Sequence, residues 1–367
     1  MATLYVNKEN LKKNIKNIRE KLNENVKIIA MVKANAYGMG DVNIAKILEE
    51  ENIDFFGVAL VKEAKHLREN GIKSKILVTS QFLEENIEDI IKYDITVSLS
   101  DINLAKKLNE EAIKFNKNVK VHIKLDTGMT RLGVSKDDIC TFVKYIKDNY
   151  TNLDVEGIYT HLSCADSDDE YTKKQIEIFE TSIDNLKDKN ITFKYIHMLN
   201  SAATIKNDKY SKYQHTHVRV GDILYGYYPD KNVKEYIKLY EIATLKAKIL
   251  QIRDIEKDSY ISYGNTFKAK KGQRIATIQI GYADGLKRKL SNDHFVYYKN
   301  NKCNIVGKIC MDMCMIDITD VNSPNVGEEV EIFGDNISVD YIAQKLDTIN
   351  YEIISTVSSR VDRIYIN

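Results

Sequence analysis

The 367-residue sequence contains no tryptophan, only two prolines and only five cysteines. The odd number of cysteines and their spacing give no disulfide framework and no zinc-binding pattern; they are Cys140, Cys164, Cys303, Cys310 and Cys314. We therefore expect reduced thiols, no metal site and a cytoplasmic location. No low-complexity tract or proline-rich stretch marks a flexible linker.

The sequence also lacks an excess of one charge and a long hydrophobic run. Lys plus Arg number 54 and Asp plus Glu number 53, which gives a formal net charge of +1. This balance provides no electrostatic footprint for nucleic acid or an anionic membrane. No apolar run approaches the roughly 20 residues that span a bilayer, and the N-terminus lacks a signal-peptide pattern. We expect a soluble protein that binds neither nucleic acid nor membrane.

Short apolar segments alternate with amphipathic segments over the first two thirds of the chain. The apolar, β-branched segments are Val26–Lys33, Phe55–Leu60, Lys75–Ser80, Asp94–Leu99, Val119–Leu125, Val155–His161, Thr192–Leu199 and Val218–Leu224. The helical segments between them are Val42–Glu50, Val61–Asn70, Leu83–Lys92, Ile102–Asn116, Lys136–Asn149 and Glu170–Lys187, with a shorter one after Asn200. This pattern is typical of parallel βαβ units, and eight strands are the number that closes a (β/α)₈ TIM barrel. A doubly wound open sheet remains an alternative.

After about Pro229 the segments become strand-like and are separated by Gly, Asn and Asp turns. They are Leu239–Asp254, Ser259–Tyr263, Arg274–Tyr282, His294–Tyr298, Cys303–Met315, Glu328–Phe333 and Ser358–Tyr365, with one helix at Val339–Leu346. This part predicts a mostly β domain. We predict an α/β chain with a barrel at 1–235 and a β-rich C-terminal domain at 236–367, to which the first few residues can contribute pairing.

Lys33 ends the first apolar segment, in KIIAMVKANAYG. Desolvating a lysine is costly unless its charge is paired or lost. A desolvated amine with a lowered pKa is a nucleophile that forms a Schiff base with a carbonyl or with pyridoxal phosphate. A lysine that snorkels to water from a strand end is the competing interpretation.

Further polar residues lie at the ends of the predicted strands or in the loops that follow, and one lies within the eighth strand. Barrel active sites lie at the carboxyl ends of the strands. These polar residues are Tyr37, Lys124, Arg131, His161, Asn200, Ser201 and Arg219. One such residue alone is typical of a structural role, whereas this many on one face favours a site. Barrels often bind phosphate at the loops after the seventh and eighth strands, where NSAA and Gly221 lie. Together with Lys33 they indicate an aldehyde cofactor that carries a phosphate.

Eight motifs, in order from about residue 4 to the C-terminus, resemble those of alanine racemases. They are VKANAYG, DTGMTRLG, THLS, NSAA, VRVG…LYG, SYGNTF, GYADG and GKICMDMCMID. The resemblance implies a pyridoxal 5'-phosphate enzyme with a barrel and a C-terminal β domain. It also implies interconversion of L- and D-alanine for bacterial cell-wall synthesis, and a homodimer with shared active sites.

The resemblance also implies residue roles. Lys33 would hold the cofactor and act as one base, and Tyr263 of the second subunit would be the opposite base. The other cofactor-binding positions are Tyr37, His161, Asn200, Ser201, Arg219, Gly221, Asp222 and Ser359. Arg131 and Met311 would receive the substrate carboxylate together with Tyr263, and Lys124 is the position of a carbamylated lysine.

Three residues depart from the family pattern. Met39 replaces a histidine, which we expect to affect packing only. Asp222 replaces an apolar residue, and Ser359 replaces a tyrosine that binds the phosphate and narrows the substrate pocket. An enzyme preferring serine, or a broader or basic range of amino acids, is therefore an alternative, as is neutral drift. A decarboxylase on the same two domains and a cofactor-binding protein without turnover are further alternatives.

Overall fold

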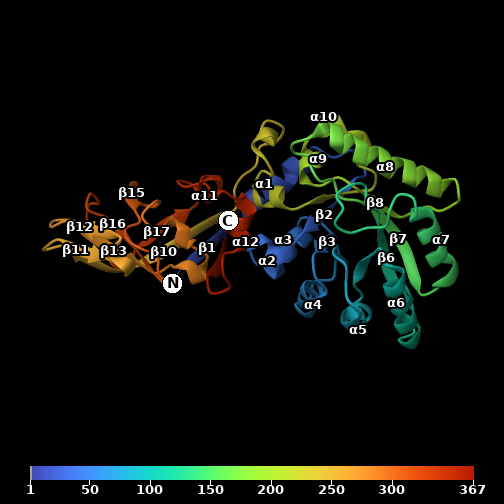
Figure 1. Cartoon of the computed structure of the whole chain (residues 1–367), viewed down its shortest axis with the longest axis horizontal. Helices are drawn as coiled ribbons and strands as arrows, with labels where there is room; N and C mark the ends of the chain where they lie inside the picture. The colour runs from blue at the N-terminus through green and yellow to red at the C-terminus, as the bar shows by residue number, and fades with distance from the viewer. Residues whose placement is uncertain (1) are drawn as a thin grey trace. The chain divides into compact units, whose positions relative to one another are not determined.

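The computed structural model describes residues 2–367, which divide into two compact units (Figure 1). The barrel unit consists of Leu11–Ala36 and Asp41–Tyr240. The β unit consists of the residues up to Asn10, the short segment Tyr37–Gly40, and Glu241–Asn367.

Eight parallel strands form the sheet of the barrel unit. They are β2 (Lys27–Met31), β3 (Phe55–Val58), β4 (Lys75–Val78), β5 (Thr96–Leu99), β6 (Val119–Lys124), β7 (Leu153–Tyr159), β8 (Tyr195–His197) and β9 (His217–Val220). Their order is β8-β7-β6-β5-β4-β3-β2-β9. Backbone bonds join the two ends of this order, from Thr216 N to Ile196 O (3.3 Å) and from Arg219 N to Leu199 O (2.9 Å). The predicted barrel is therefore confirmed as a nearly closed one, and the open-sheet alternative is wrong.

Helices lie outside this ring of strands (Figure 1). They are α1 (Lys8–Arg19), which begins in the β unit, α3 (Asp41–Glu50), α4 (Val61–Glu69), α5 (Ile87–Lys92), α6 (Ile102–Lys114), α7 (Ile139–Asn149), α8 (Asp169–Lys187), α9 (Ser201–Ile205) and α10 (Asn207–Tyr210). Side-chain caps fix where some begin, because they accept bonds from otherwise unpaired backbone amides. Asp101 accepts from Asn103 N and Leu104 N, at 2.8 and 2.9 Å, at the start of α6.

Ten strands and two helices make up most of the β unit. The strands are β1 (Thr3–Asn7), β10 (Ala243–Asp254), β11 (Ser259–Ile261), β12 (Phe267–Ala269), β13 (Arg274–Ile278), β14 (Phe295–Tyr298), β15 (Asn301–Asn304), β16 (Cys314–Asp317), β17 (Glu329–Phe333) and β18 (Asp362–Ile366); the helices are α11 (Val339–Leu346) and α12 (Asn350–Ser355). The main order is β15-β14-β17-β10-β1-β18.

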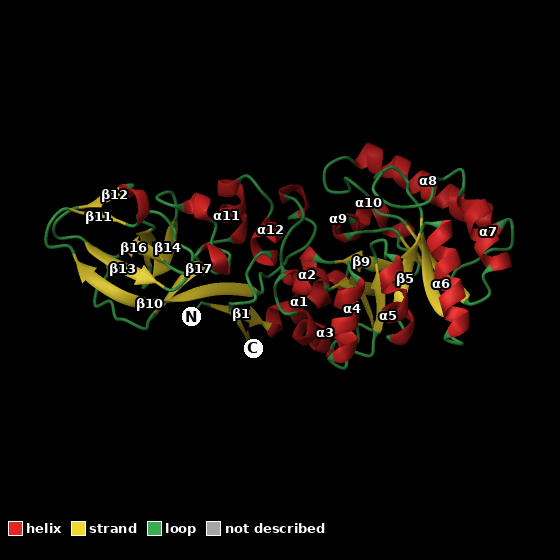
Figure 2. Ribbon diagram, turned by 60° about the horizontal axis from the view of Figure 1, so that its bottom comes forward, coloured by secondary structure: helices red, strands yellow, loops and turns green. Residues whose placement is uncertain are grey.

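The long strand β10 organises the β unit (Figure 2). Its first half pairs with β1 and β17, and its second half pairs with β13, which in turn pairs with β16. A register shift between Ile249 and Gln251 lies where its partner changes from β17 to β13. One extended segment of the sequence therefore serves two parts of the sheet.

Several predicted boundaries are wrong. The predicted strand Val26–Lys33 ends at Met31. The predicted strand Cys303–Met315 contains the end of β15, a loop and the start of β16. Tyr263 lies beyond β11 in a 3-10 turn, because Ser262 has a left-handed φ of 63° that ends the strand. Helix α12 was not predicted.

Among residues 2–367, no helix has both the length and the apolar character needed to cross a membrane. Within the same range, no group of three or more His, Cys, Asp or Glu side chains is arranged to hold a metal ion.

Candidate active site

Lys33 lies just after β2, at the carboxyl end of the barrel strands, and opens the segment labelled α2 (Lys33–Tyr37). Burial lowers the pKa of its amine, and the nearby Arg131 guanidinium lowers it further, whereas Glu63 and Asp222 act in the opposite direction. The amine therefore loses its proton more readily than an exposed lysine, as a nucleophile or base requires.

The backbone after Lys33 is left-handed at four consecutive residues. The φ angles of Ala34, Asn35, Ala36 and Tyr37 are 51°, 56°, 50° and 54°. This conformation costs about 1–2 kcal/mol for each residue with a Cβ atom. Strain of this kind persists only where surrounding contacts impose it, and it is concentrated at functional sites.

Glu63, on α4, supplies such contacts. Its Oε1 accepts from Ala34 N at 2.7 Å. Its Oε2 accepts from Ala59 N at 2.8 Å and from Leu60 N at 3.0 Å. One carboxylate thus ties the turn that follows Lys33 to the loop after β3. Glu63 was not predicted from the sequence, because a glutamate on an amphipathic helix resembles an ordinary solvated residue.

Lys124 ends β6, and Arg131 lies in the loop that follows. Burial lowers the pKa of Lys124 to about 8, and Arg131 and Arg219 both contribute to this shift. Asp126 Oδ1 accepts from Gly128 N at 2.9 Å and from Thr130 N at 3.1 Å, which fixes the loop that carries Arg131.

Arg219, on β9, is buried and held by both terminal nitrogens. Nη1 donates to His197 Nδ1 and to His197 O, each at 2.8 Å. Nη2 donates to Thr160 O at 2.6 Å and to Met198 O at 3.1 Å. Burial lowers its pKa to about 10, so it stays charged at neutral pH. Within residues 2–367 these contacts leave Nε–H as the donor for a ligand.

His161 follows β7, and its Nδ1 lies 3.4 Å from Arg219 Nη2. Burial holds the pKa of His161 well below its usual range, and the charges of Arg219, Arg131, Lys124 and Lys33 act in the same direction. The imidazole is therefore neutral at physiological pH, and it lies among the cationic groups of the site.

A second pair of histidines supports Arg219 from inside the barrel. His197 Nε2 lies 2.9 Å from His122 Nδ1, and His122 Nε2 lies 3.5 Å from Glu156 Oε1. Because arginine can only donate, His197 accepts at Nδ1 and donates at Nε2. Burial lowers the pKa of both imidazoles. We missed this pair because we singled out residues at strand ends; histidines inside the apolar runs VHIK and YIHML were the available signal.

The loops after β8 and β9 meet at Ser201 and Gly221. Gly221 N donates to Ser201 Oγ at 3.1 Å. Asn200 caps α9 by accepting from Ala203 N at 3.1 Å, and its Nδ2 donates to Leu162 O at the same distance. Asp222 opens the 3-10 turn η3 (Asp222–Tyr225) and is buried.

The remaining predicted residues lie in the β unit. The rings of Tyr37 and Tyr351 meet edge to face, with centroids 6.5 Å apart. Tyr263 lies in the turn between β11 and β12, and Ser262 Oγ donates to Lys308 O at 2.6 Å. That bond ties the turn of Tyr263 to the loop that carries Met311. Tyr263 is 70% exposed and Met311 is 51% exposed.

The Met311 loop also packs against the turn at Gly281. A Cβ atom at Gly281 would lie 2.2 Å from Met311 O, so only glycine fits there. Ala283 N donates to Met311 O at 3.0 Å. Ser359 belongs to a loop held beside these two, because Arg360 Nη2 donates to Asp312 Oδ1 at 2.8 Å.

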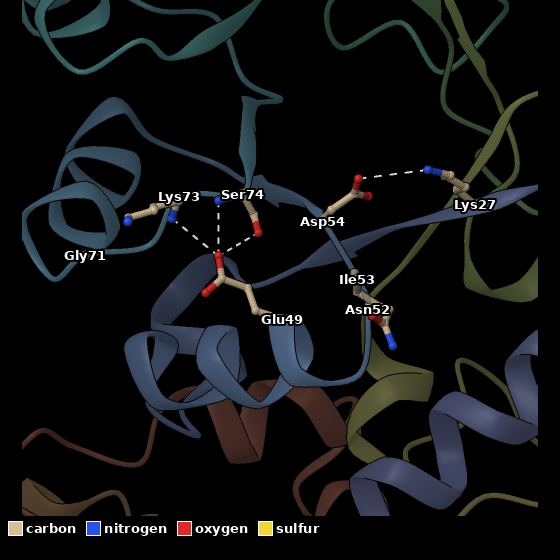
Figure 3. Close-up of a pocket in the computed structure, with 8 residues that line it drawn as sticks. All are labelled: Lys27, Glu49, Asn52, Ile53, Asp54, Gly71, Lys73 and Ser74. Carbon is tan, nitrogen blue, oxygen red and sulfur yellow. Dashed lines mark hydrogen bonds and ion pairs between the residues drawn. The ribbon is translucent and has the colours of Figure 1, made fainter.

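A depression of about 640 Å³ lies at the opposite, amino end of the barrel strands (Figure 3). Its polar groups bind one another: Glu49 Oε1 accepts from Ser74 N at 3.1 Å and from Ser74 Oγ at 2.6 Å. Lys27 and Asp54 form an ion pair at 3.9 Å. None of the predicted site residues lines it.

Comparisons with known proteins match both units. The family model "Alanine racemase, N-terminal domain" matches residues 6–229, and "Alanine racemase, C-terminal domain" matches residues 242–365. Alanine racemase 1 of Caldanaerobacter subterraneus subsp. tengcongensis is 41% identical over 96% of this chain and 91% of its own length. Alanine racemase of Methanococcus maripaludis is 41% identical over 97% of this chain and 96% of its own length.

Solved structures agree with these sequence matches. Alanine racemase of Clostridium difficile 630 superposes with a TM-score of 0.96 at 37% identity, covering 100% of this chain and 95% of that one. Alanine racemase of Bacillus anthracis with bound L-Ala-P gives a TM-score of 0.91 at 33% identity, with the same coverage. These relatives lend no support to the alternative of a preference for serine or a basic amino acid.

Proposed function

The chain belongs to the alanine racemase family, and on that premise we propose that it interconverts L- and D-alanine with pyridoxal 5'-phosphate as its cofactor. The observation that carries this proposal is the Lys33 amine. It is half-buried at the carboxyl end of the barrel strands, and its pKa is lowered by desolvation and by Arg131. That is the state in which a lysine attacks a carbonyl.

The residues around Lys33 fit this cofactor. Ser201 and the amides near Gly221 join two loops into a cradle for the phosphate, with Tyr37, Asn200, Asp222 and Ser359 as further contacts. The pyridine nitrogen would accept from Arg219, whose orientation is fixed through both terminal nitrogens, while His161 supports the ring. When bound, the cofactor withdraws electrons from the substrate Cα and makes its proton removable.

Racemisation then needs a proton removed from one face of Cα and returned on the other. Lys33 serves one face and Tyr263 the other, each as base in one direction and acid in the reverse. Arg131 and the backbone amide of Met311 bind the substrate carboxylate, which keeps Cα between the two bases.

We propose that Lys124 carries a carbamate. Its pKa of about 8 leaves a substantial fraction of neutral amine at physiological pH. The neutral amine adds to CO₂, a C–N bond forms and one proton is released, which converts the neutral amine into an anionic carbamate. That anion would pair with Arg131 and orient it toward the substrate.

We further propose a homodimer with shared active sites. Tyr263 and Met311 are largely exposed in the single chain, yet their roles require a closed site. A second subunit supplying both residues removes that conflict, because each site is then completed by its partner.

We also propose a cytoplasmic location. All five cysteines are free thiols in the structure, as in a protein that folds in a reducing compartment. Titration with a thiol reagent in denaturant should count five thiols per chain in freshly purified protein, and fewer would argue against this location.

The decisive experiment incubates purified protein with L-alanine and measures D-alanine. Tyr263→Phe should lose at least about 100-fold in kcat, the scale of a lost acid–base group, while cofactor absorbance persists. Tyr260→Phe is the matched control, because Tyr260 is also exposed on the same hairpin. Borohydride reduction and peptide mapping should label Lys33. Full activity in Tyr263→Phe would contradict the two-base assignment, and labelling at another lysine would contradict the proposed cofactor site.

A further inference from the structure

Asp222 places a carboxylate beside the loops that would hold the cofactor phosphate. It follows Gly221 directly, and only 8% of its surface is exposed. Its Oδ1 accepts from Ile223 N at 3.1 Å. The Ser201 hydroxyl also bonds to it. The carboxylate therefore already uses hydrogen-bond donors that a phosphate in this cradle would need.

We propose that the Asp222 carboxylate competes with the cofactor phosphate for these donors, so that the phosphate binds more tightly when Asp222 has taken up a proton. This inference rests on the proposed function, because it concerns the cofactor of that same site. A buried carboxylate and a phosphate that share donors repel each other, and protonating the carboxyl group removes the repulsion and turns it into a donor.

The surroundings of Asp222 make that proton uptake feasible. Burial raises its pKa to about 6, whereas Ser201, Ile223 N and the charge of Lys33 act to lower it. These groups come from α9, from η3 and from the segment after β2. A phosphate nearby adds a like charge, which raises the pKa further. The pKa of Asp222 is then higher with phosphate bound than without it.

The sign of the pH dependence follows from this difference. Between the two pKa values, binding takes up a proton, so each rise of one pH unit weakens phosphate binding by up to tenfold. The affinity contributed by the phosphate should therefore fall as the pH rises above about 6. The second ionisation of the phosphate itself, near pH 6, affects phosphate binding equally in wild type and variants.

The test compares two ligands that differ only in the phosphate. Pyridoxamine 5'-phosphate and pyridoxamine are titrated calorimetrically into cofactor-free protein at pH 5.5 and pH 8. The Kd of pyridoxamine divided by the Kd of pyridoxamine 5'-phosphate reports the contribution of the phosphate. Neither ligand has an aldehyde, so Lys33 chemistry does not enter. In Asp222→Asn the ratio at pH 8 should be at least about tenfold larger than in wild type. Asp154→Asn, at the exposed amino end of β7, should match wild type.

Equal ratios in wild type and Asp222→Asn at pH 8 would overturn the inference and leave the proposed function intact. Failure of both proteins to bind pyridoxamine 5'-phosphate would overturn the proposed function and this inference with it. If Asp222→Asn does not fold, as judged by circular dichroism, the inference is tested on the wild-type protein alone. Titration in two buffers of different ionisation enthalpy at pH 7 should then show net proton uptake with the phosphate ligand, and none or a release would overturn the inference.

Discussion

Ala34 is an exposed residue with a left-handed backbone, immediately after the lysine on which the proposed chemistry depends. Its methyl group opposes the conformation that the fold imposes. Ala34→Gly should therefore stabilise the protein by about 0.5–1 kcal/mol, since the strain removed exceeds the added freedom of glycine in the unfolded chain. Denaturant unfolding measures the change.

The control for this prediction is Ala112→Gly, at a buried position in the last turn of α6. There the backbone is an ordinary helix, so glycine should destabilise the protein by at least about 1 kcal/mol. Opposite signs for the same substitution would establish that backbone strain, and not side-chain size, decides the result at Ala34. A loss of stability in both variants would mean that the turn is not strained.

Single residues also mark the limit of sequence-based prediction at this site. The rule that functional groups lie at or after the ends of barrel strands led us to Lys33 and His161, and Arg219 was singled out within the eighth strand, because position in a βαβ pattern is visible in the sequence. The supports of these residues were not visible. His197 contacts Arg219 directly, and His122 contacts it through His197, both inside the barrel. Such a series of hydrogen-bonded side chains depends on three-dimensional packing.

At the scale of elements, α4 controls the turn after β2 through one side chain. The two carboxylate oxygens of Glu63 accept hydrogen bonds from three backbone amides. Glu63→Gln leaves one oxygen and turns the other position into a donor, so at least one amide loses its acceptor. We expect a destabilisation of about 1–3 kcal/mol.

The same substitution should change the chemistry of Lys33. The Glu63 charge raises the pKa of the Lys33 amine, so Glu63→Gln should lower that pKa further. The pH midpoint for acylation of Lys33 in cofactor-free protein, followed by mass spectrometry, should shift to lower pH. Glu49→Gln is a control on the neighbouring helix α3, at the amino end of the barrel strands. An unchanged midpoint in Glu63→Gln would show that Glu63 holds the turn but does not raise the pKa of Lys33.

Element prediction was reliable where a strand or helix buries one regular face and failed where the backbone turns abruptly. All eight barrel strands were found because each is a short apolar run between helices. Tyr263 was assigned to a strand, although Ser262 turns the chain left-handed before it. In the same way, Cys303–Met315 is apolar enough to resemble one strand, but its middle loop approaches the turn at Gly281. Contacts between distant segments decide such turns.

For the whole molecule, buried histidines make stability depend on pH. Burial lowers the pKa of His217 in the barrel unit and of His294 in the β unit to about 4, against about 6.5 in the unfolded chain. Between these values the unfolded state binds more protons, so the free energy of unfolding falls as the pH falls. The loss is about 1.4 kcal/mol per pH unit for each such histidine.

The urea midpoint should therefore drop steadily from pH 7 to pH 4.5, before the carboxyl group of Asp169, whose pKa is held below its usual range by Lys209, begins to titrate. His294→Phe should reduce this slope, because the phenyl ring keeps the stacking on Tyr341 and removes the proton-binding site. If His294→Phe kept the wild-type slope, the acid sensitivity would have to come from other groups.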